Sequence, residues 1–285
     1  MSSASIPATT SAQVSGTNDA GDHAKITLYT NHGCGWSHRV HIVLKELGLE
    51  YKEVLIDMDV PRPDWFLKLN SRGLVPVFQY TPRGSNQKFT FIESAQIVSF
   101  LTDLYPSHIL PVLPSDPELS GTSSAAQTAY LRYQMSIFVD TYFTKINPLM
   151  FKLVGADHGI PQEKIVDEII VLLEKEIEPL LSDVDANGKG PYFAGSERLT
   201  FVEAMTTPFV LRLIDFCNDI IFPSRLAKAM LDTNPSTSNL PRFAKWAKLC
   251  MQHPSVTYTW DKERMVPRVV ERLPAAKRKY APTKE

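Results

Sequence analysis

The segment Ile26-Thr-Leu-Tyr-Thr-Asn-His-Gly-Cys-Gly-Trp-Ser37 decides the fold that the sequence predicts. Its first part, Ile26–Thr30, has the β-branched and aromatic content of a short strand, and Asn31–Gly33 has the composition of a turn. Between Trp36 and Leu47 the apolar residues recur every three or four positions, which indicates an amphipathic helix. The chain therefore passes from strand to turn to helix, and Cys34 lies where the helix begins.

Strand and helix patterns alternate through the next part of the chain. Tyr51–Ile56 alternates apolar and polar side chains as a half-buried strand does, and Asp64–Leu69 has the pattern of a short helix. Val75–Tyr80 and Lys88–Ile92 predict an antiparallel hairpin, because the loop between them contains several turn-forming residues. Glu93–Tyr105 returns to helical spacing. This order predicts a thioredoxin-like α/β domain built on a four-stranded mixed sheet.

The second half of the chain is predicted to be an all-α helical bundle. Apolar residues from Leu131 to Leu149 step by three and four positions along one helix, and those from Ile165 to Leu180 do so along another. Thr200-Phe-Val-Glu203 matches a capping box at the start of a helix that runs to Phe216. Asn239–Gln252 predicts a further helix.

These patterns divide the chain into successive parts. They are a disordered tail rich in Ser, Ala and Thr (1–25), the thioredoxin-like domain (26–106), a proline-containing linker (107–119), the helical domain (120–275) and a basic tail (276–285).

Composition and charge exclude several classes of function. The chain has 285 residues, and 30 Lys and Arg against 31 Asp and Glu give a formal net charge of −1, so we expect binding neither to nucleic acid nor to a membrane. No apolar run approaches the roughly 18 to 20 residues that cross a bilayer. The three cysteines are scattered, which disfavours a disulfide framework and suits a reducing compartment. The N-terminal residues lack the apolar core of a secretory signal, so we expect a cytoplasmic protein.

Cys34 is the residue that we expect to carry chemistry. The free N–H groups and the positive dipole end of a helix stabilise a thiolate, and cysteine pKa values at such positions fall from about 8.5 to a range of roughly 3.5 to 7.5. Ser37 stands where a dithiol redox motif has its second cysteine, so the partner of Cys34 would be an external thiol, and its targets a mixed disulfide or an electrophilic carbon. Alternatively, Cys34 is a small buried apolar residue, which is the role that we assign to Cys217 and Cys250.

Four motifs in order carry a family resemblance. They are Cys-Gly-Trp-Ser-His-Arg-Val at 34–40, Arg-Pro-Asp-Trp-Phe at 62–66, Gly-Leu-Val-Pro-Val at 73–77 and Ile-Glu-Ser-Ala at 92–95. With these motifs the chain resembles a cytosolic glutathione transferase of the omega-like, cysteine-type branch found among fungi. The match runs motif by motif from Ile26 to Leu113 and in layout to about Phe222. The resemblance implies glutathione as co-substrate, a homodimer and no metal.

The resemblance also implies the residues of the site. Cys34 matches the active-site thiol that forms a mixed disulfide with glutathione. Val75–Pro76 matches a cis pair whose backbone faces the cysteinyl part, and Glu93 and Ser94 match the pair that holds the γ-glutamyl end. Arg62 falls where a basic residue meets the glycine carboxylate, although it suits a solvated surface charge equally well. The implied glutathione-binding set is Trp36, Arg62, Leu74, Val75, Pro76, Glu93 and Ser94.

The second substrate is expected between the two domains. Tyr130, Tyr133 and Phe138 would line its site, with Trp36 at the mouth. An aromatic stripe at helical spacing is more often part of a core, so these residues suit internal packing as well.

Gly35 departs from the family, because relatives usually have proline after the active-site cysteine. Glycine lacks the fixed φ of proline, so we expect a looser helix start and a thiol that is exposed or displaced. His38 and Arg39 follow on the same helix. We expect them to be an outward-facing, solvated pair rather than a source of positive potential for Cys34.

Three functions are compatible with these residues. In the first, Cys34 performs thiol transfer, reducing mixed disulfides or removing glutathione from a small hydrophobic electrophile. In the second, glutathione is the nucleophile and the protein only lowers the pKa of its thiol, which gives a conjugating transferase. In the third, the chain binds glutathione without catalysis. Thiol transfer is the function that we expect, in detoxification or in fungal secondary metabolism.

Overall fold

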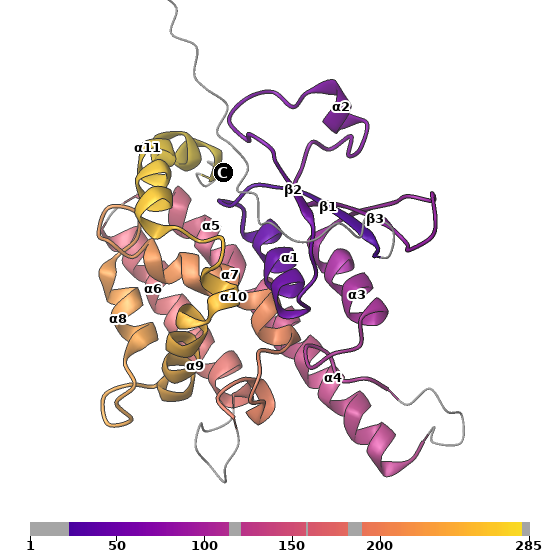
Figure 1. The fold of residues 1–285 in the computed structure, drawn as a ribbon. Helices are drawn as coiled ribbons and strands as arrows, with labels where there is room; N and C mark the ends of the chain where they lie inside the picture. Colours follow the sequence, from indigo (N-terminus) through magenta and orange to yellow (C-terminus); the bar gives the residue numbers. More distant parts are fainter. Residues whose placement is uncertain (1–22, 114–120, 158, 182–189, 281–285) are drawn as a thin grey trace, which may run out of the picture.

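The computed structural model describes residues 23–113, 121–157, 159–181 and 190–280, and its N-terminal part alternates strands and helices (Figure 1). These elements are β1 (Lys25–Thr30), α1 (Gly35–Glu46), β2 (Lys52–Leu55), α2 (Asp64–Leu67), β3 (Val77–Thr81), β4 (Phe89–Ile92) and α3 (Ser94–Leu104). Every strand and helix that the sequence predicts in this part is present.

The strands form one mixed sheet in the order β2-β1-β3-β4. β1 is parallel to β2 and antiparallel to β3, and β3 is antiparallel to β4. Helices α1 and α3 cover one face of this sheet, where Leu28, Val43, Phe78 and Ile97 are fully buried (Figure 1). The prediction of a thioredoxin-like domain is confirmed.

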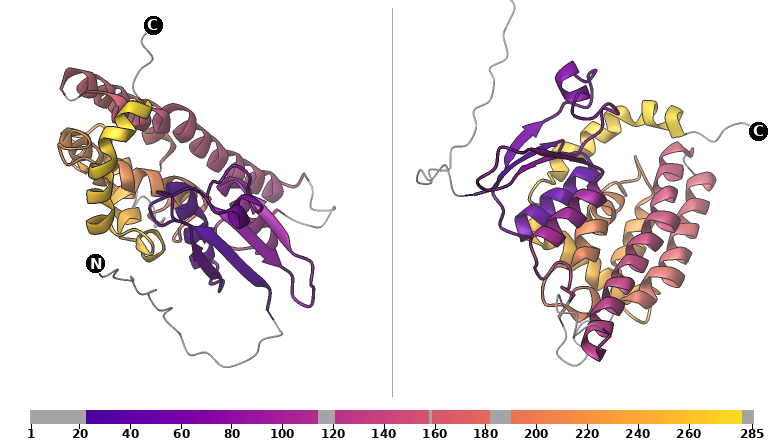
Figure 2. Two further views of the ribbon diagram at one scale, coloured as in Figure 1. Left: turned by 90° about the horizontal axis from the view of Figure 1, so that it is seen from above. Right: turned by 90° about the vertical axis from the view of Figure 1, so that its right-hand side faces the viewer.

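The rest of the described chain is helical, as predicted. Its α-helices are α4 (Ser123–Thr141), α5 (Asn147–Gly155), α6 (Ile160–Leu172), α7 (Phe201–Asp215), α8 (Ser224–Leu231), α9 (Pro241–Gln252), α10 (Pro254–Thr257) and α11 (Lys262–Tyr280). It also contains the π turns η2 (Tyr142–Ile146) and η3 (Leu173–Ile177) and the 3-10 turns η4 (Glu178–Leu180) and η6 (Phe193–Gly195). Figure 2 shows the helices beside the sheet domain, with α11 crossing from that domain toward α5. None of the described helices has both the length and the apolar content needed to cross a bilayer.

The apolar stripe between Leu131 and Leu149 extends over more than one helix. Helix α4 continues through the π turn η2 into α5, so the single helix that the spacing predicts is interrupted. A π turn holds an extra residue per turn, and side-chain spacing alone does not reveal it. The predicted face is nevertheless the buried one, because the core includes Met135, Phe138, Tyr142, Ile146 and Leu149.

The capping box at Thr200 is present and does more than begin α7. Thr200 N–H donates to Glu203 Oε2 at 2.8 Å, and Thr200 Oγ1 accepts the N–H of Val202 at 3.2 Å. Glu203 Oε1 also accepts hydrogen bonds from Trp246 Nε1 at 2.7 Å and from Phe193 N–H at 2.8 Å. This fully buried carboxylate therefore ties α7 to α9 and to η6.

The ends of the chain and the linker are described only in part. Residues 1–22 of the predicted tail, 114–119 of the predicted linker and 281–285 lie outside the described residues. Lys277–Lys279 form the last turn of α11, so the described part of the expected basic tail continues a helix. Neither α8 nor α11 is predicted from the sequence pattern, and α11 contains two prolines that interrupt the usual helix pattern.

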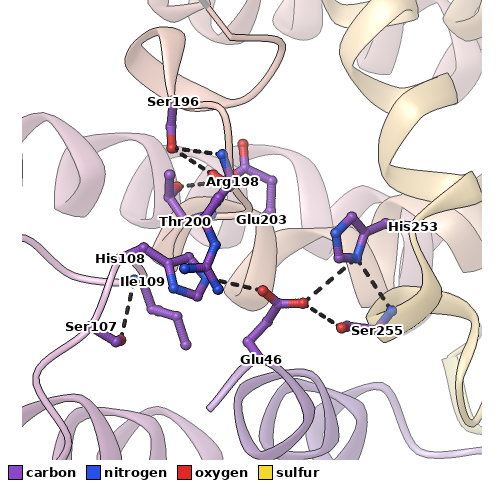
Figure 3. Close-up of polar contacts among 10 residues, drawn as sticks. All are labelled: Glu46, Ser107, His108, Ile109, Ser196, Arg198, Thr200, Glu203, His253 and Ser255. Atoms are coloured by element: carbon purple, nitrogen blue, oxygen red, sulfur yellow. Dashed lines mark hydrogen bonds and ion pairs between the residues drawn. The ribbon is translucent and has the colours of Figure 1, made fainter. Parts of the chain in front are cut away.

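A polar cluster around Glu46 joins the two domains (Figure 3). Glu46 ends α1, and its carboxylate pairs with His108 Nε2 at 2.9 Å and accepts a hydrogen bond from Ser255 Oγ. His253 Nδ1 lies 3.8 Å from the same carboxylate and accepts the N–H of Ser255 at 3.2 Å. Because α1 also packs against α7 and α10, the helix that begins at Cys34 is held firmly by the helical domain.

Candidate functional site

Cys34 is the N-cap residue of α1, as predicted. Its N–H donates to Asn31 O at 2.9 Å, and its carbonyl oxygen accepts the N–H of His38 at 3.1 Å. The thiol is half-buried, and its sulfur lies 3.8 Å from the carbonyl oxygen of Val75. The sulfur therefore sits between the start of α1 and the loop that leads into β3.

A cleft of about 350 Å³ opens beside Cys34, and we call it the Val75 cleft. Its lining residues are Cys34, Trp36, Met58, Asn70, Arg72, Leu74, Val75, Pro76, Glu93 and Ser94. The Val75–Pro76 peptide bond is cis, as the resemblance implies. The structure thus brings every residue of the predicted glutathione-binding set except Arg62 to one cleft beside the sulfur.

Arg62 lies outside the Val75 cleft. Its guanidinium donates to the carbonyl oxygens of Asp57 at 2.6 Å, Met58 at 3.0 Å and Gly73 at 3.2 Å, and also to that of Val60. Arg62 therefore fastens its own loop to the turn at Gly73. This role differs from both expectations for Arg62. The guanidinium binds backbone carbonyl oxygens, and it neither lines the cleft nor stands as a free surface charge.

Arg72 lines the cleft instead, and the sequence analysis missed it. Its guanidinium pairs with the carboxylate of Glu93, and its N–H donates to Asn70 Oδ1 at 3.1 Å. Glu93 precedes α3 with a φ of 67°, a conformation that residues other than glycine rarely adopt. One end of the cleft therefore presents a guanidinium and a carboxylate side by side, ahead of the N-terminus of α3.

Arg39 is buried, contrary to the expectation of an outward-facing pair. Its Nε donates to Met205 O at 2.9 Å, and its Nη1 donates to Ser94 Oγ at 3.2 Å. Three aromatic rings surround its guanidinium, with centroid distances of 4.6 Å to Trp36, 4.1 Å to Phe143 and 5.1 Å to Phe209. Burial lowers the pKa of Arg39 to about 9, opposed mainly by the nearby Cys34. The expectation is wrong because α7 packs on α1 and covers this side chain.

Arg212, in α7, is a second buried guanidinium beneath the Cys34 loop. Its Nη2 donates to His32 O at 3.1 Å, and its Nε lies 3.4 Å from Gly33 O. The ring of Trp260 stacks 4.2 Å from its guanidinium carbon. Burial lowers the pKa of Arg212 to about 10, again with Cys34 as the leading group that opposes this shift. Arg212 thus holds the two carbonyls that precede Cys34.

His38 is also buried, and its neighbours fix its tautomer. Its Nε2 donates to Val256 O at 2.7 Å, because a carbonyl oxygen can only accept. Its Nδ1, 3.0 Å from Arg212 Nη1, must then accept from that guanidinium. Burial, together with Arg212, lowers the pKa of His38 well below its usual value. His38 is therefore a neutral positioning residue for Arg212.

Neither buried guanidinium has a carboxylate partner among the ion pairs of the described residues, and the first turn of α1 contains no acidic residue. Asp215 is near Arg212, but it pairs with Lys262 at 2.9 Å and accepts from Trp260 Nε1 at 2.7 Å. Unpaired buried charge is costly, so an anion bound at Cys34 would be stabilised by both groups.

Gly35 is covered by the ring of Phe209. A β-carbon at this glycine would lie 3.1 Å from Phe209 Cε1, closer than side chains normally pack. The ring of Phe209 is itself confined, with centroid distances of 4.6 Å to Trp36 and 4.9 Å to Phe143. The helix start is therefore closely packed rather than loose, and the place usually held by proline is filled by an aromatic ring from α7.

A second cavity, of about 210 Å³, also borders Cys34, and we call it the α11 cavity. It is lined by Asn31, Gly33, Cys34, Met58, Asp59, Phe216, Trp260, Met265, Arg268, Val269 and Arg272. Asp59 pairs with Arg268 at 2.8 Å and also with Arg272, so α11 is fastened over the cavity by ion pairs. Cys34 borders both cavities.

The aromatic residues expected to line the second-substrate site are placed on or inside the helical part of the chain. Phe138 is fully buried against Phe193 and Trp246, which is the core role left open for it. Tyr130 and Tyr133 are exposed on α4 and stack on each other with centroids 5.9 Å apart. None of the three lines either cavity beside Cys34. Met265, Arg268, Val269 and Arg272 of α11, a helix that the sequence pattern does not predict, form part of the wall of the α11 cavity instead.

The other two thiols are placed as packing residues. Cys250 is buried in α9, and burial raises its pKa well above the usual value. Cys217 follows α7, where its thiol donates to Leu213 O at 3.1 Å and burial raises its pKa to about 12. Both are therefore protonated thiols at neutral pH.

Comparisons with known proteins find similar proteins among the glutathione transferases. The family described as "Glutathione S-transferase, N-terminal domain" matches residues 33–104. Glutathione S-transferase omega-1 of Sus scrofa is 25% identical over 232 residues, covering 81% of this chain and 79% of that protein. The glutathione S-transferase-like protein OpS6 of Beauveria bassiana is 24% identical over 234 residues, covering 81% and 92%. The crystal structure of glutathione transferase Omega 2C from Trametes versicolor aligns with a TM-score of 0.68 at 24% identity, covering 88% of this chain and 99% of that one.

The fold is therefore the glutathione transferase fold, with a thioredoxin-like N-terminal domain and a helical second part. The resemblance to omega-like glutathione transferases, fungal ones included, is confirmed.

Gly35→Ala should destabilise the protein by about 1 to 3 kcal/mol, because the new methyl group meets a ring that cannot retreat. In the Gly35→Ala/Phe209→Leu double variant that collision is removed. We expect urea unfolding to show the double variant about 1 kcal/mol more stable than the sum of the two single effects.

Phe138→Leu is the matched control for this cycle, because Phe138 is a buried ring that packs against Phe193 and Trp246 and is not one of the rings that confine Phe209. It should not rescue Gly35→Ala. Strictly additive effects of Gly35→Ala and Phe209→Leu would contradict the close packing at the helix start.

Proposed function

We propose that this protein is a glutathione-dependent transferase in which Cys34 is the nucleophile for thiol transfer. The single observation that carries the proposal is the position of its sulfur. The sulfur borders both the Val75 cleft and the α11 cavity, beside two buried guanidinium groups that have no carboxylate partner among the described ion pairs. Glutathione in one cavity and a second substrate in the other can therefore both reach the sulfur of Cys34.

The Val75 cleft supplies a group for each part of glutathione. The backbone of Val75 is placed to pair with the cysteinyl residue as an added strand would. Glu93 suits the γ-glutamyl ammonium group, and Ser94 with the N–H groups that begin α3 suits its carboxylate. Arg72 adds a guanidinium at the same end, and Arg39 supports Ser94 from behind.

The proposed reaction consists of two thiol–disulfide exchanges. The Cys34 thiolate attacks the glutathione sulfur of a mixed disulfide, so a bond forms between Cys34 and glutathione while the substrate leaves with the electron pair as a thiolate. A second glutathione thiolate then attacks this intermediate, which forms glutathione disulfide and restores the Cys34 thiolate. The second glutathione is the reductant, because its sulfur is oxidised to half of the disulfide while the substrate sulfur is reduced to a thiolate, so no other reductant is required.

The second substrate is proposed to occupy the α11 cavity. Its walls combine apolar surface from Phe216, Trp260 and Met265 with the paired charges of Asp59 and α11. A small, largely hydrophobic electrophile or mixed disulfide fits this lining. Such a substrate range would suit detoxification or secondary metabolism, and three free cysteines suit the cytoplasm.

A conjugating transferase is the second candidate, and the same two guanidinium groups favour it. Arg39 and Arg212 would stabilise a glutathione thiolate lying against Cys34 as well as they would stabilise the Cys34 thiolate. In that case Cys34 is a neighbour of the reacting sulfur and not the nucleophile.

We also propose that the protein is a homodimer, as the resemblance implies. Tyr130, Tyr133 and Ile137 form an exposed apolar face on α4 that a second copy would cover. Sedimentation equilibrium should give about twice the chain mass of 32.0 kDa. A mass equal to that of one chain would contradict the proposal.

Cys34→Ser should lower the rate of glutathione-dependent reduction of a small mixed disulfide by on the order of 10³-fold, because the nucleophile is lost. Cys217→Ser is the control and should keep the rate, since that thiol is held protonated away from both cavities. Full thiol transfer by Cys34→Ser would end the proposal. Conjugation of an aryl halide that survives in Cys34→Ser would support the second candidate.

Arg72→Ala should weaken glutathione binding about tenfold, which corresponds to the loss of one charge-assisted hydrogen bond. Arg62→Ala is a matched arginine that does not reach the cleft, so it should lower thermal stability and leave affinity nearly unchanged. Titration calorimetry of folded variants measures both. An unchanged affinity in Arg72→Ala would contradict this assignment, and no binding by the unmodified protein at millimolar glutathione would reject both enzyme functions.

A further inference from the structure

Two histidines and a glutamate lie together at the edge of the sheet, away from the Val75 cleft. His32 is in the loop after β1, His41 is in α1, and Glu53 is in the edge strand β2. Glu53 Oε1 lies 2.6 Å from His32 Nε2 and 3.6 Å from His41 Nε2. The three candidate ligand atoms all lie within 4.8 Å of one another. Only folding brings them together, so their spacing in the sequence does not indicate a metal site, and the family resemblance implies none.

The surroundings of His41 hold its ring in a fixed orientation. The side chain is fully buried, with Nδ1 2.8 Å from the hydroxyl of Tyr51 and Nε2 2.8 Å from Thr30 Oγ1. When Nδ1 donates to Tyr51, Nε2 carries the lone pair of the ring and accepts from Thr30 Oγ1, a hydrogen bond that a metal ion bound at Nε2 would replace. A hydrogen bond from the second ring nitrogen is the usual support of a metal-binding histidine.

We propose that His32, His41 and Glu53 form a binding site for a divalent transition metal ion of the zinc class. Two imidazoles and one carboxylate are a common donor set for such ions, which bind these atoms at about 2.0 to 2.2 Å. A tetrahedral ion at that distance separates its ligands by roughly 3.4 Å. The observed separations bracket this value, so His32 and Glu53 need only small rotations to admit the ion.

The exposure of the three groups suits an ion that enters from solvent. The side chains of His32 and Glu53 are 29% and 33% exposed, while that of His41 is 0% exposed. The open side leaves a coordination position for water. His32 also lies two residues before Cys34, and its carbonyl oxygen is held by Arg212. A bound ion would therefore fix the loop that leads to the thiol. The site itself does not depend on the proposed glutathione chemistry.

Titration of chelator-treated full-length protein with Zn²⁺ tests the site. The Cys34→Ser background is used throughout, so that the nearby thiol cannot supply a ligand. We expect saturable binding of one equivalent, and Co²⁺ should give visible ligand-field bands without a thiolate charge-transfer band. His32→Ala and Glu53→Gln should each weaken Zn²⁺ binding at least tenfold.

His108→Ala is the matched control, because His108 also pairs with a glutamate, Glu46, in a different cluster (Figure 3). It should bind Zn²⁺ as tightly as the background protein does. Unchanged affinity in both His32→Ala and Glu53→Gln would overturn the proposal. The proposal is also overturned if the background protein gives neither binding heat nor a Zn²⁺-induced shift in melting temperature.

Discussion

Two positive charges buried behind one sulfur are the constraint on which this site depends. Taking a guanidinium out of water costs several kcal/mol unless polar partners replace the water. Arg39 finds these partners in Met205, Ser94 and three aromatic rings, and Arg212 finds them in carbonyl oxygens and His38. These partners are neutral, so the positive charge remains available to an anion at Cys34.

The same contacts show that both domains form the surroundings of Cys34. The sheet domain supplies the sulfur and the Val75 cleft, while α7 supplies Arg212 and the ring that packs on Gly35. Helix α11 closes the other side of the sulfur and is fastened to the sheet domain through Asp59. The α11 cavity beside the thiol exists only once the helical part has packed against α1, because Phe216, Trp260 and Met265 form part of its wall.

Much of this arrangement could be predicted from the sequence, because it depends on local pattern. The strand, turn and helix around Cys34, the hairpin and the capping box at Thr200 all follow from residue spacing and turn chemistry. The family motifs add the cis peptide at Val75 and the grouping of Glu93 and Ser94 at one cleft.

The remaining features depend on contacts between distant parts of the chain. Arg39 bonds to a carbonyl 166 residues away, so nothing near it in the sequence reveals that it is buried. Arg72 reaches the cleft only because its turn faces α3, where Glu93 meets it. The part of the cavity wall that α11 forms could not be predicted, because two prolines interrupt the helical pattern of its sequence. Nothing near Gly35 in the sequence indicates that it is covered, because the ring of Phe209 belongs to another domain.

The most direct measurement is the mass of the protein after treatment with glutathione disulfide, followed by peptide mapping of the modified residue. The account predicts one glutathione per chain, attached through a disulfide to Cys34 and removed by excess glutathione. An unmodified Cys34, or a glutathione attached to Cys217 in its place, would contradict it.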